Sequence, residues 1–218
     1  MYSNVASAFW PWIGQFEGVF RSDGIRFGWL GLDKLGRPAT AYGCDLPSPQ
    51  AMAQIIWRHS PDQNSPVASY AEVVHEWARV DAMQAYKAYG GASDVFMNSA
   101  HLYYDVASLT AWCNRKLALL EQQILSTIPN YATIPGLAQM ARMRTSWADG
   151  GASKWPHLDL AISQGNWVEA QNQCMPEDYD VQTTAYQQSY QAVKQMYGLC
   201  GQFPGNDLPE SIPNGSNA

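Results

Sequence analysis

Two acids in contrasting surroundings, Glu17 and Asp33, are the residues of this sequence best suited to chemistry. Glu17 ends an aromatic stretch that contains Trp12 and Phe16, and partial removal from water would favour its protonated form near neutral pH. Asp33 opens a turn at Gly36, where contact with water would keep it ionised. Such a pair fits glycoside hydrolysis, in which one carboxylic acid protonates the leaving oxygen and a second carboxylate activates water or stabilises the transition state.

Two alternatives to this pairing remain open at the level of sequence. Asp23 lies between the two acids, so it competes with Asp33 for the part of the second carboxylate. The plainer interpretation is structural, because a helix can simply end at Glu17 and Asp33 can form an ordinary hairpin turn with Gly36. Taken alone, the opening stretch favours this structural interpretation.

Short motifs around the two acids resemble those of the phage-type lysozymes. That family pairs an acid-Gly helix end with an Asp-x-x-Gly-x-x-Thr-x-Gly-x-Gly hairpin. This chain has Phe16-Glu17-Gly18, then Leu32-Asp33-x-x-Gly36, then Tyr42-Gly43. Further segments in the second half are similar to the helical lobe of the same family, at residues 128–135, 146–150 and 165–170. The resemblance runs from about residue 8 to about residue 199 and reverses the preference for a purely structural interpretation.

The fold that the resemblance implies is α+β and mostly α. It consists of a small β-hairpin or sheet lobe and a larger helical lobe with a cleft between them. We expect one lysozyme-like domain over residues 1–200, with the lobes at about 1–90 and 94–200. The stretch Gly90-Gly91-Ala92-Ser93 would join the lobes, and residues 201–218 would form a flexible tail.

The activity that the resemblance implies is that of a muramidase. Such an enzyme hydrolyses the β-1,4 bond between N-acetylmuramic acid and N-acetylglucosamine in bacterial peptidoglycan. Glu17 would be the general acid, Asp33 its partner, and Thr40 the hydroxyl that positions water. The substrate contacts expected on the same basis are Asp23, Tyr42, Arg144 and Trp147.

The hairpin departs from the family pattern at several positions. Ala39 stands where the family has Thr, and Ala41 and Cys44 replace a Gly and a polar residue. Thr40 comes one place late, and in a regular strand that shift turns its hydroxyl to the opposite face unless a bulge intervenes. These departures support a second hypothesis, a catalytically inactive lysozyme-fold protein that binds glycans or serves as a structural virion component.

Arg142 and Arg144 lie in a predicted helix and have two interpretations. Either arginine could face Glu17 and modulate its acidity, or could hydrogen-bond an acetamido sugar. A position on a solvated helix face is the more frequent outcome for each of them.

Composition limits the partners and compartments of the protein. The chain has 218 residues, a net charge of −6, nine Trp and twelve Tyr. A negative charge argues against nucleic acid as a partner, since phosphates require Lys and Arg. Neither an apolar stretch long enough for a membrane span nor a Sec-type signal is recognisable. We expect synthesis in the cytoplasm, and action in the periplasm or on the cell wall of a bacterial target, during phage lysis or as a delivered effector.

Peptidoglycan is therefore the expected partner, and an effector role would call for a dedicated inhibitor protein in the producing cell. We expect a monomer without a cofactor. The four cysteines have no metal-binding spacing and are expected to be buried, with Cys174 and Cys200 the first disulfide pair to test.

Apolar periodicity predicts mostly helices along the chain. The one at 106–128 has the strongest apolar stripe and is expected to be the central core helix. A two- or three-stranded sheet is expected over 19–46. Further helices are expected at about 5–18, 48–57, 69–89, 135–148, 155–164, 166–174 and 181–200.

Overall fold

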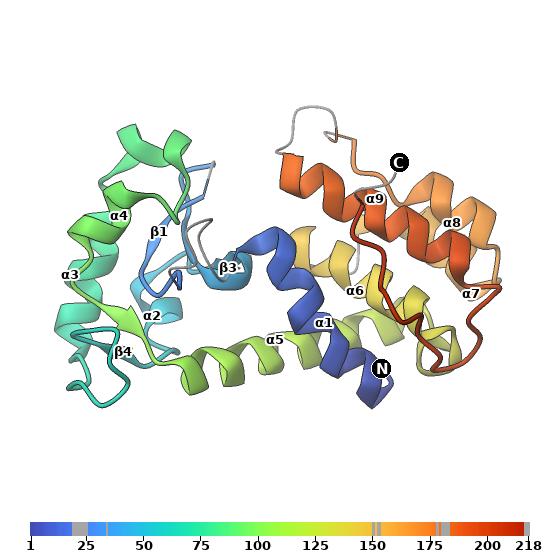
Figure 1. The fold of residues 1–218 in the computed structure, drawn as a ribbon, viewed down its shortest axis with the longest axis horizontal. Helices are drawn as coiled ribbons and strands as arrows, with labels where there is room; N and C mark the ends of the chain where they lie inside the picture. The colour runs from blue at the N-terminus through green and yellow to red at the C-terminus, as the bar shows by residue number, and fades with distance from the viewer. Residues whose placement is uncertain are drawn as a thin grey trace. The chain divides into compact units, whose positions relative to one another are not determined.

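The computed structural model describes residues 1–18, 26–33, 35–149, 151, 154–177, 179 and 184–215. Within these ranges the chain is α+β and mostly helical, and it contains a small antiparallel sheet (Figure 1). The expected class is thereby confirmed at that level of description.

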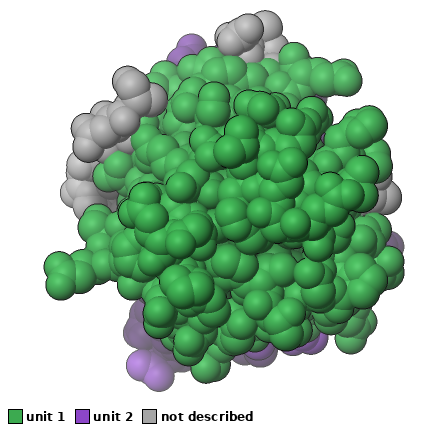
Figure 2. Space-filling view, turned by 90° about the vertical axis from the view of Figure 1, so that its right-hand side faces the viewer, with its two compact units in different colours: residues 1–17, 116–218 green, residues 18–115 purple. Residues whose placement is uncertain are grey.

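The chain divides into two compact units by its internal contacts. Unit 1 comprises residues 1–17 and 116–218, and unit 2 comprises residues 18–115 (Figure 2). The glycine-rich stretch expected to join two lobes lies inside unit 2 instead. The indole N–H of Trp29 donates to the carbonyl of Gly91 at 2.9 Å, and a Cβ added to Gly31 would overlap the backbone of Gly91. These glycines serve close packing of two backbone segments.

Unit 1 is helical in the part that the structure describes. It contains α1 (Ser3–Glu17), the C-terminal part of α5 (Val106–Thr127), the short 3-10 helix η3 (Tyr131–Thr133), α6 (Gly136–Asp149), α7 (Pro156–Ser163), α8 (Trp167–Gln173) and α9 (Thr184–Leu199). Helix α6 packs against α1 and α9, and α8 packs against α7 and α9. Residues 136–147 of α6 are all buried, so α6 forms the centre of this unit.

The prediction that the helix at 106–128 is the central core helix was therefore wrong. Its stripe of apolar residues is buried as expected, but its other faces are largely exposed. A strong stripe marks a helix that is covered on one side only, whereas a central helix is buried all round. Because α6 contains several polar residues, its sequence did not show that it lies at the centre of the unit.

Unit 2 holds the sheet and several short helices. The three-stranded sheet has the order β1 (Gly31–Leu32), β2 (Pro38–Thr40), β3 (Cys44–Asp45), antiparallel throughout. A second antiparallel pair joins β4 (Trp57–Arg58) to β5 (Tyr103–Tyr104). The helical segments besides the start of α5 include η1 (Ala41–Gly43), α2 (Pro49–Met52), α3 (Tyr70–Asp81), η2 (Gln84–Tyr89) and α4 (Asp94–Ser99).

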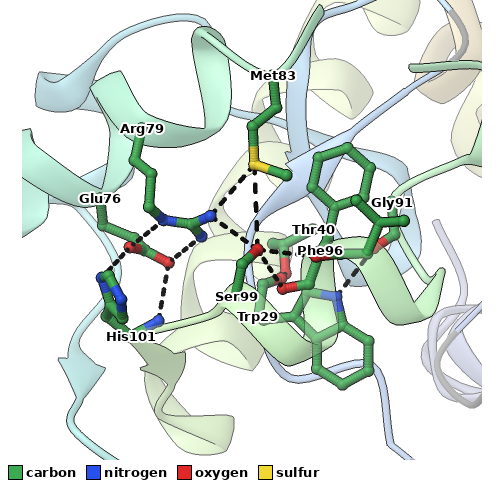
Figure 3. Close-up of polar contacts among 10 residues, drawn as sticks. Trp29, Thr40, Glu76, Arg79, Met83, Gly91, Phe96, Ser99 and His101 are labelled. Carbon is green, nitrogen blue, oxygen red and sulfur yellow. Dashed lines mark hydrogen bonds and ion pairs between the residues drawn. The ribbon is translucent and has the colours of Figure 1, made fainter. Parts of the chain in front are cut away.

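A buried polar network in unit 2 ties α3 to the segment after it (Figure 3). Arg79 donates to both carboxylate oxygens of the buried Glu76, at 2.9 and 2.7 Å, and to the hydroxyl of Ser99 at 2.9 Å. The backbone N–H of His101 donates to the same carboxylate at 3.2 Å. Glu76 is thereby held by groups from its own helix and from the end of α4 onward.

Helix ends follow local capping chemistry where the sequence provides it. Ser69 and Glu72 form a capping box at the start of α3, and Asn166 accepts the N–H of Glu169 at the start of α8. The predicted helix over 69–89 ends at Asp81 and is followed by a 3-10 turn. The predicted helix from residue 48 to residue 57 ends at Met52, before β4 begins.

Residues 201–215, for which we expected a flexible tail, are part of unit 1 and are hydrogen-bonded to its other segments. The indole N–H of Trp12 donates to the carbonyl of Pro213 at 2.7 Å, and the N–H of Gly136 donates to the carbonyl of Gly205 at 2.7 Å. Hydrogen bonds to the backbone carbonyls of this segment, which apolar periodicity does not report, hold it in place.

All four cysteines are buried free thiols, so the Cys174–Cys200 pair is not bonded in this structure. Among the described residues, no helix combines the length and hydropathy needed to cross a membrane.

We predict that Gly31→Ala destabilises the protein by about 1–3 kcal/mol or more, because the new methyl group would overlap the Gly91 backbone. Gly28→Ala is the matched control, since its Cβ would make an ordinary 3.6 Å contact with the Tyr103 ring. Urea denaturation measures both, and equal costs for the two variants would contradict the close approach of residues 31 and 91.

Candidate functional site

Glu17 forms an ion pair inside unit 1. It is the last residue of α1, and its carboxylate oxygen Oε1 lies 2.7 Å from Nη2 of Arg144 on α6. The side chain of Arg144 is fully buried, whereas that of Glu17 is 23% exposed. The chain leaves the helix through Gly18, which has a positive φ of 65°. One oxygen of a partly exposed carboxylate is thus fixed by a buried guanidinium.

The surroundings of Arg144 leave part of its hydrogen-bonding capacity unused. Nη2 also donates to the hydroxyl of Ser189 at 2.9 Å, and the guanidinium carbon lies 5.6 Å from the ring centroids of both Tyr186 and Tyr190. The Nε and Nη1 groups are buried and have no hydrogen-bond partner among the residues that the structure describes. Because unpaired buried donors are costly, this guanidinium is well placed to bind a further acceptor.

The expectation that Arg142 and Arg144 lie on a solvated face was wrong, since both are fully buried. Arg142 pairs with Asp159 on α7 at 2.5 Å and donates to the hydroxyls of Thr145 and Ser146. Its partner is 17 positions away in the sequence. Helical periodicity could not identify that partner, so a charged residue was placed at the surface.

Asp33 is engaged in the turn that joins β1 to β2. Its Oδ1 accepts the backbone N–H groups of Leu35 and Arg37 at 2.9 and 2.8 Å, and its Oδ2 accepts the Arg37 Nε–H at 2.6 Å. Both oxygens therefore serve the turn and its ion pair with Arg37. This geometry agrees with the structural interpretation of Asp33 rather than with a carboxylate that is available to activate water.

Thr40 is buried in the three-stranded sheet. Its hydroxyl donates to the carbonyl of Trp29 at 2.8 Å, and the side chain is 2% exposed (Figure 3). Thr40 pairs with Cys44 and Ala39 with Asp45 in a regular register, without the bulge that would have turned the hydroxyl. The hydroxyl therefore donates its proton inside the sheet.

Tyr42 has an unusual backbone conformation that the sequence pattern did not predict. Its φ is 62°, in the left-handed region that residues other than glycine rarely adopt. The side chain is half-buried, and burial raises the pKa of its phenol, with Arg26 acting in the opposite direction. Gly43 also has a positive φ. The dipeptide Tyr42-Gly43 was the sequence feature that could have indicated this turn.

Trp147 belongs to the core of unit 1. Only 3% of it is exposed, and its ring packs edge-on against Phe9 and Trp10 at centroid distances of 6.4 and 5.2 Å. The ammonium of Lys116 lies 4.3 Å from the centroid of the same ring. A ring covered in this way has no free face for a sugar. Asp23, the remaining predicted contact, lies outside the described residues.

Of the residues predicted from sequence, the structure therefore brings Glu17 and Arg144 into direct contact. Ser189, Tyr186 and Tyr190 were missed as members of the same cluster. The stripe of α9 that contains the two tyrosines indicated burial, but not the contact with Arg144. No group of three or more metal-binding side chains suited to an ion occurs in the described part of the chain.

Comparison with known proteins adds no family to this description. No protein-family model matches the chain, and no match was found among curated proteins or solved structures.

The two buried arginines of α6 provide a matched stability test. Arg142→Met should cost about 3–5 kcal/mol, because it leaves Asp159 buried without its partner. Arg144→Met should cost at most about half of that, since it removes two unpaired donors and leaves a carboxylate that water can reach. Chemical denaturation of both variants measures the difference, and the reverse order would contradict this assignment.

Proposed function

We propose that this protein is a peptidoglycan muramidase with a lysozyme-like fold, in which Glu17 is the general acid and Arg144 positions it. The observation that carries the proposal is the ion pair between a partly exposed carboxylate and a fully buried guanidinium. Holding one oxygen fixes the direction of the other, as a group that must deliver a proton to a defined oxygen requires. The bacterial cell wall is the proposed place of action.

In the proposed reaction Glu17 protonates the glycosidic oxygen as the C–O bond breaks. A salt bridge stabilises the ionised form of a carboxyl group, so the ion pair must loosen when the acid carries its proton in the substrate complex.

The carboxylate that activates water has to belong to an acid whose oxygens are not already engaged in other contacts. Both carboxylate oxygens of Asp33 are engaged by its turn and by Arg37, which weakens the support for it as the base. We propose Asp23, the alternative that the sequence left open, as the residue that activates water.

Glu17→Gln should lower the rate of peptidoglycan hydrolysis by about 10²–10⁴-fold, since general acid catalysis contributes a factor of that size. Glu210→Gln is the matched control, because Glu210 is exposed near the C-terminus and should leave the rate unchanged. Clearing of purified peptidoglycan together with the appearance of new reducing ends measures glycan cleavage. An equally active Glu17→Gln variant would exclude Glu17 as the acid.

The two candidate bases should separate in the same assay. Asp23→Asn should remove most of the activity, whereas Asp33→Asn should retain activity and lower thermal stability, because it disturbs the turn contacts. Measuring the melting temperature beside the rate distinguishes these effects. A loss of activity in Asp33→Asn at unchanged stability would return the catalytic role to Asp33.

The second candidate function is a glycan-binding or structural protein without hydrolytic activity. It is favoured by the Thr40 hydroxyl and the Asp33 carboxylate, which are both spent on internal contacts. Wild-type protein that sediments with peptidoglycan but never produces reducing ends would establish this function in place of the muramidase.

A further inference from the structure

Cys44 and Cys113 bring two sulfur atoms into contact inside unit 2. Their Sγ atoms lie 3.4 Å apart, and either thiol can donate to the other. Both side chains are buried, with exposed fractions of 0% and 1%. The two residues are 69 positions apart in the sequence, so only the fold brings them together.

A regular backbone element places each of these cysteines. Cys44 begins β3 and pairs with Thr40 of the central strand β2. Cys113 lies on the buried apolar stripe of α5. The hydroxyl of Ser108 accepts the N–H of Ile56 at 2.8 Å, which anchors the start of α5 to the segment before β4. The backbone around both sulfur atoms is therefore ordered without a covalent bond between them.

The separation of the two sulfur atoms is short enough for a disulfide to form within the folded arrangement. A disulfide has a sulfur–sulfur bond of about 2.05 Å, so the atoms have to approach each other by about 1.4 Å. Rotations of about 30° around the two Cα–Cβ bonds can supply that approach at a small cost in energy. Neither β3 nor α5 has to move.

The thiols of Cys174 and Cys200 are engaged differently. The Sγ of Cys174 donates to the carbonyl of Gln171 at 3.3 Å, and the Sγ of Cys200 donates to the carbonyl of Met196 at 3.2 Å. Each of these thiols is thus directed to the backbone of its own helical segment. The structure therefore favours a different pair from the one that the sequence favoured.

We propose that Cys44 and Cys113 form a disulfide when the protein is in an oxidising compartment, and that this bond stabilises unit 2 by joining β3 to α5. The oxidant is another disulfide. The thiolate of one cysteine attacks it and releases a first thiol, and the second cysteine then attacks the mixed disulfide and releases a second thiol. The two cysteine protons and two electrons pass to the oxidant. In a reducing compartment the pair stays as two thiols.

Burial determines when this bond forms. An oxidant reaches the two sulfur atoms before folding is complete or during local opening, because the folded chain covers both of them. A bond across 69 positions restricts the unfolded chain, so the oxidised protein should be the more stable form. The proposal is independent of the hydrolysis proposed for Glu17.

Refolding of the full chain with glutathione disulfide, beside refolding with a phosphine reductant, tests the proposal. After alkylation of the remaining thiols, mass spectrometry of the digested oxidised protein should show two peptides linked through Cys44 and Cys113. The oxidised protein should melt about 5–15 °C above the reduced protein, as expected for a long closed loop in a chain of this size.

Two sets of variants assign the effect to this pair. Cys113→Ala should abolish the difference in melting temperature between the two preparations, whereas the double variant Cys174→Ala, Cys200→Ala should preserve it. The peptide map needs only the wild type, so the test does not depend on the folding of a variant.

Alkylation of both Cys44 and Cys113 after oxidative refolding would overturn the proposal. A bond between Cys174 and Cys200 in their place, or a bond between two chains, would overturn it as well. Equal melting temperatures of the oxidised and the reduced wild type would contradict the stabilising role of the bond. Peptidoglycan cleavage is not measured in any of these experiments, so their outcome is separate from that of the proposed function.

Discussion

A guanidinium group that is fully removed from water governs the arrangement around Glu17. Arg144 keeps its charge in the protein interior, and its compensation comes from one carboxylate oxygen, one serine hydroxyl and the faces of two tyrosine rings. The end of α1 must therefore stay against α6, because separating them would leave a buried charge without its counterion. The same contact fixes the side chain that we propose as the acid.

Helix α6 shows how a polar sequence can occupy the centre of a helical unit. Its buried Gln139 donates to the carbonyl of Tyr131 at 2.9 Å and accepts the N–H of Tyr2 at 2.8 Å. Arg142 is compensated by Asp159 in a similar way. Gln139 and Arg142 each have partners on other segments, so those segments cannot exchange positions without losing these bonds. Specific pairing here adds to the apolar packing of the neighbouring helices.

Unit 2 uses its polar residues for a different purpose, which is to define tight turns in a sheet of very short strands. Asp33 closes one turn with Arg37, Thr40 secures its strand to Trp29, and Tyr42 accepts a left-handed conformation in the next turn. Strands of two or three residues provide few ladder hydrogen bonds, so side chains have to contribute the remaining order. The residues that resemble a catalytic hairpin thus all contribute to the conformation of this hairpin.

The sequence by itself determined the helical character of the chain and many of its local boundaries. Apolar periodicity located the helices at 3–17, 106–127, 136–149 and 184–199 closely, and the side chain of Asn166 set the start of α8. These features depend on residues within one or two turns of one another, so a local pattern contains the information.

Only the tertiary structure decided which polar residues are buried and which acid has a partner. Arg142, Arg144 and Asp33 look alike in a sequence as charged residues, yet two are in the core and one is tied to a turn. Their environments depend on groups far along the chain or on backbone geometry, neither of which periodicity encodes. The closeness of Glu17 to Arg144 joins residues 127 positions apart (144 − 17), and it exists only because α1 packs on α6.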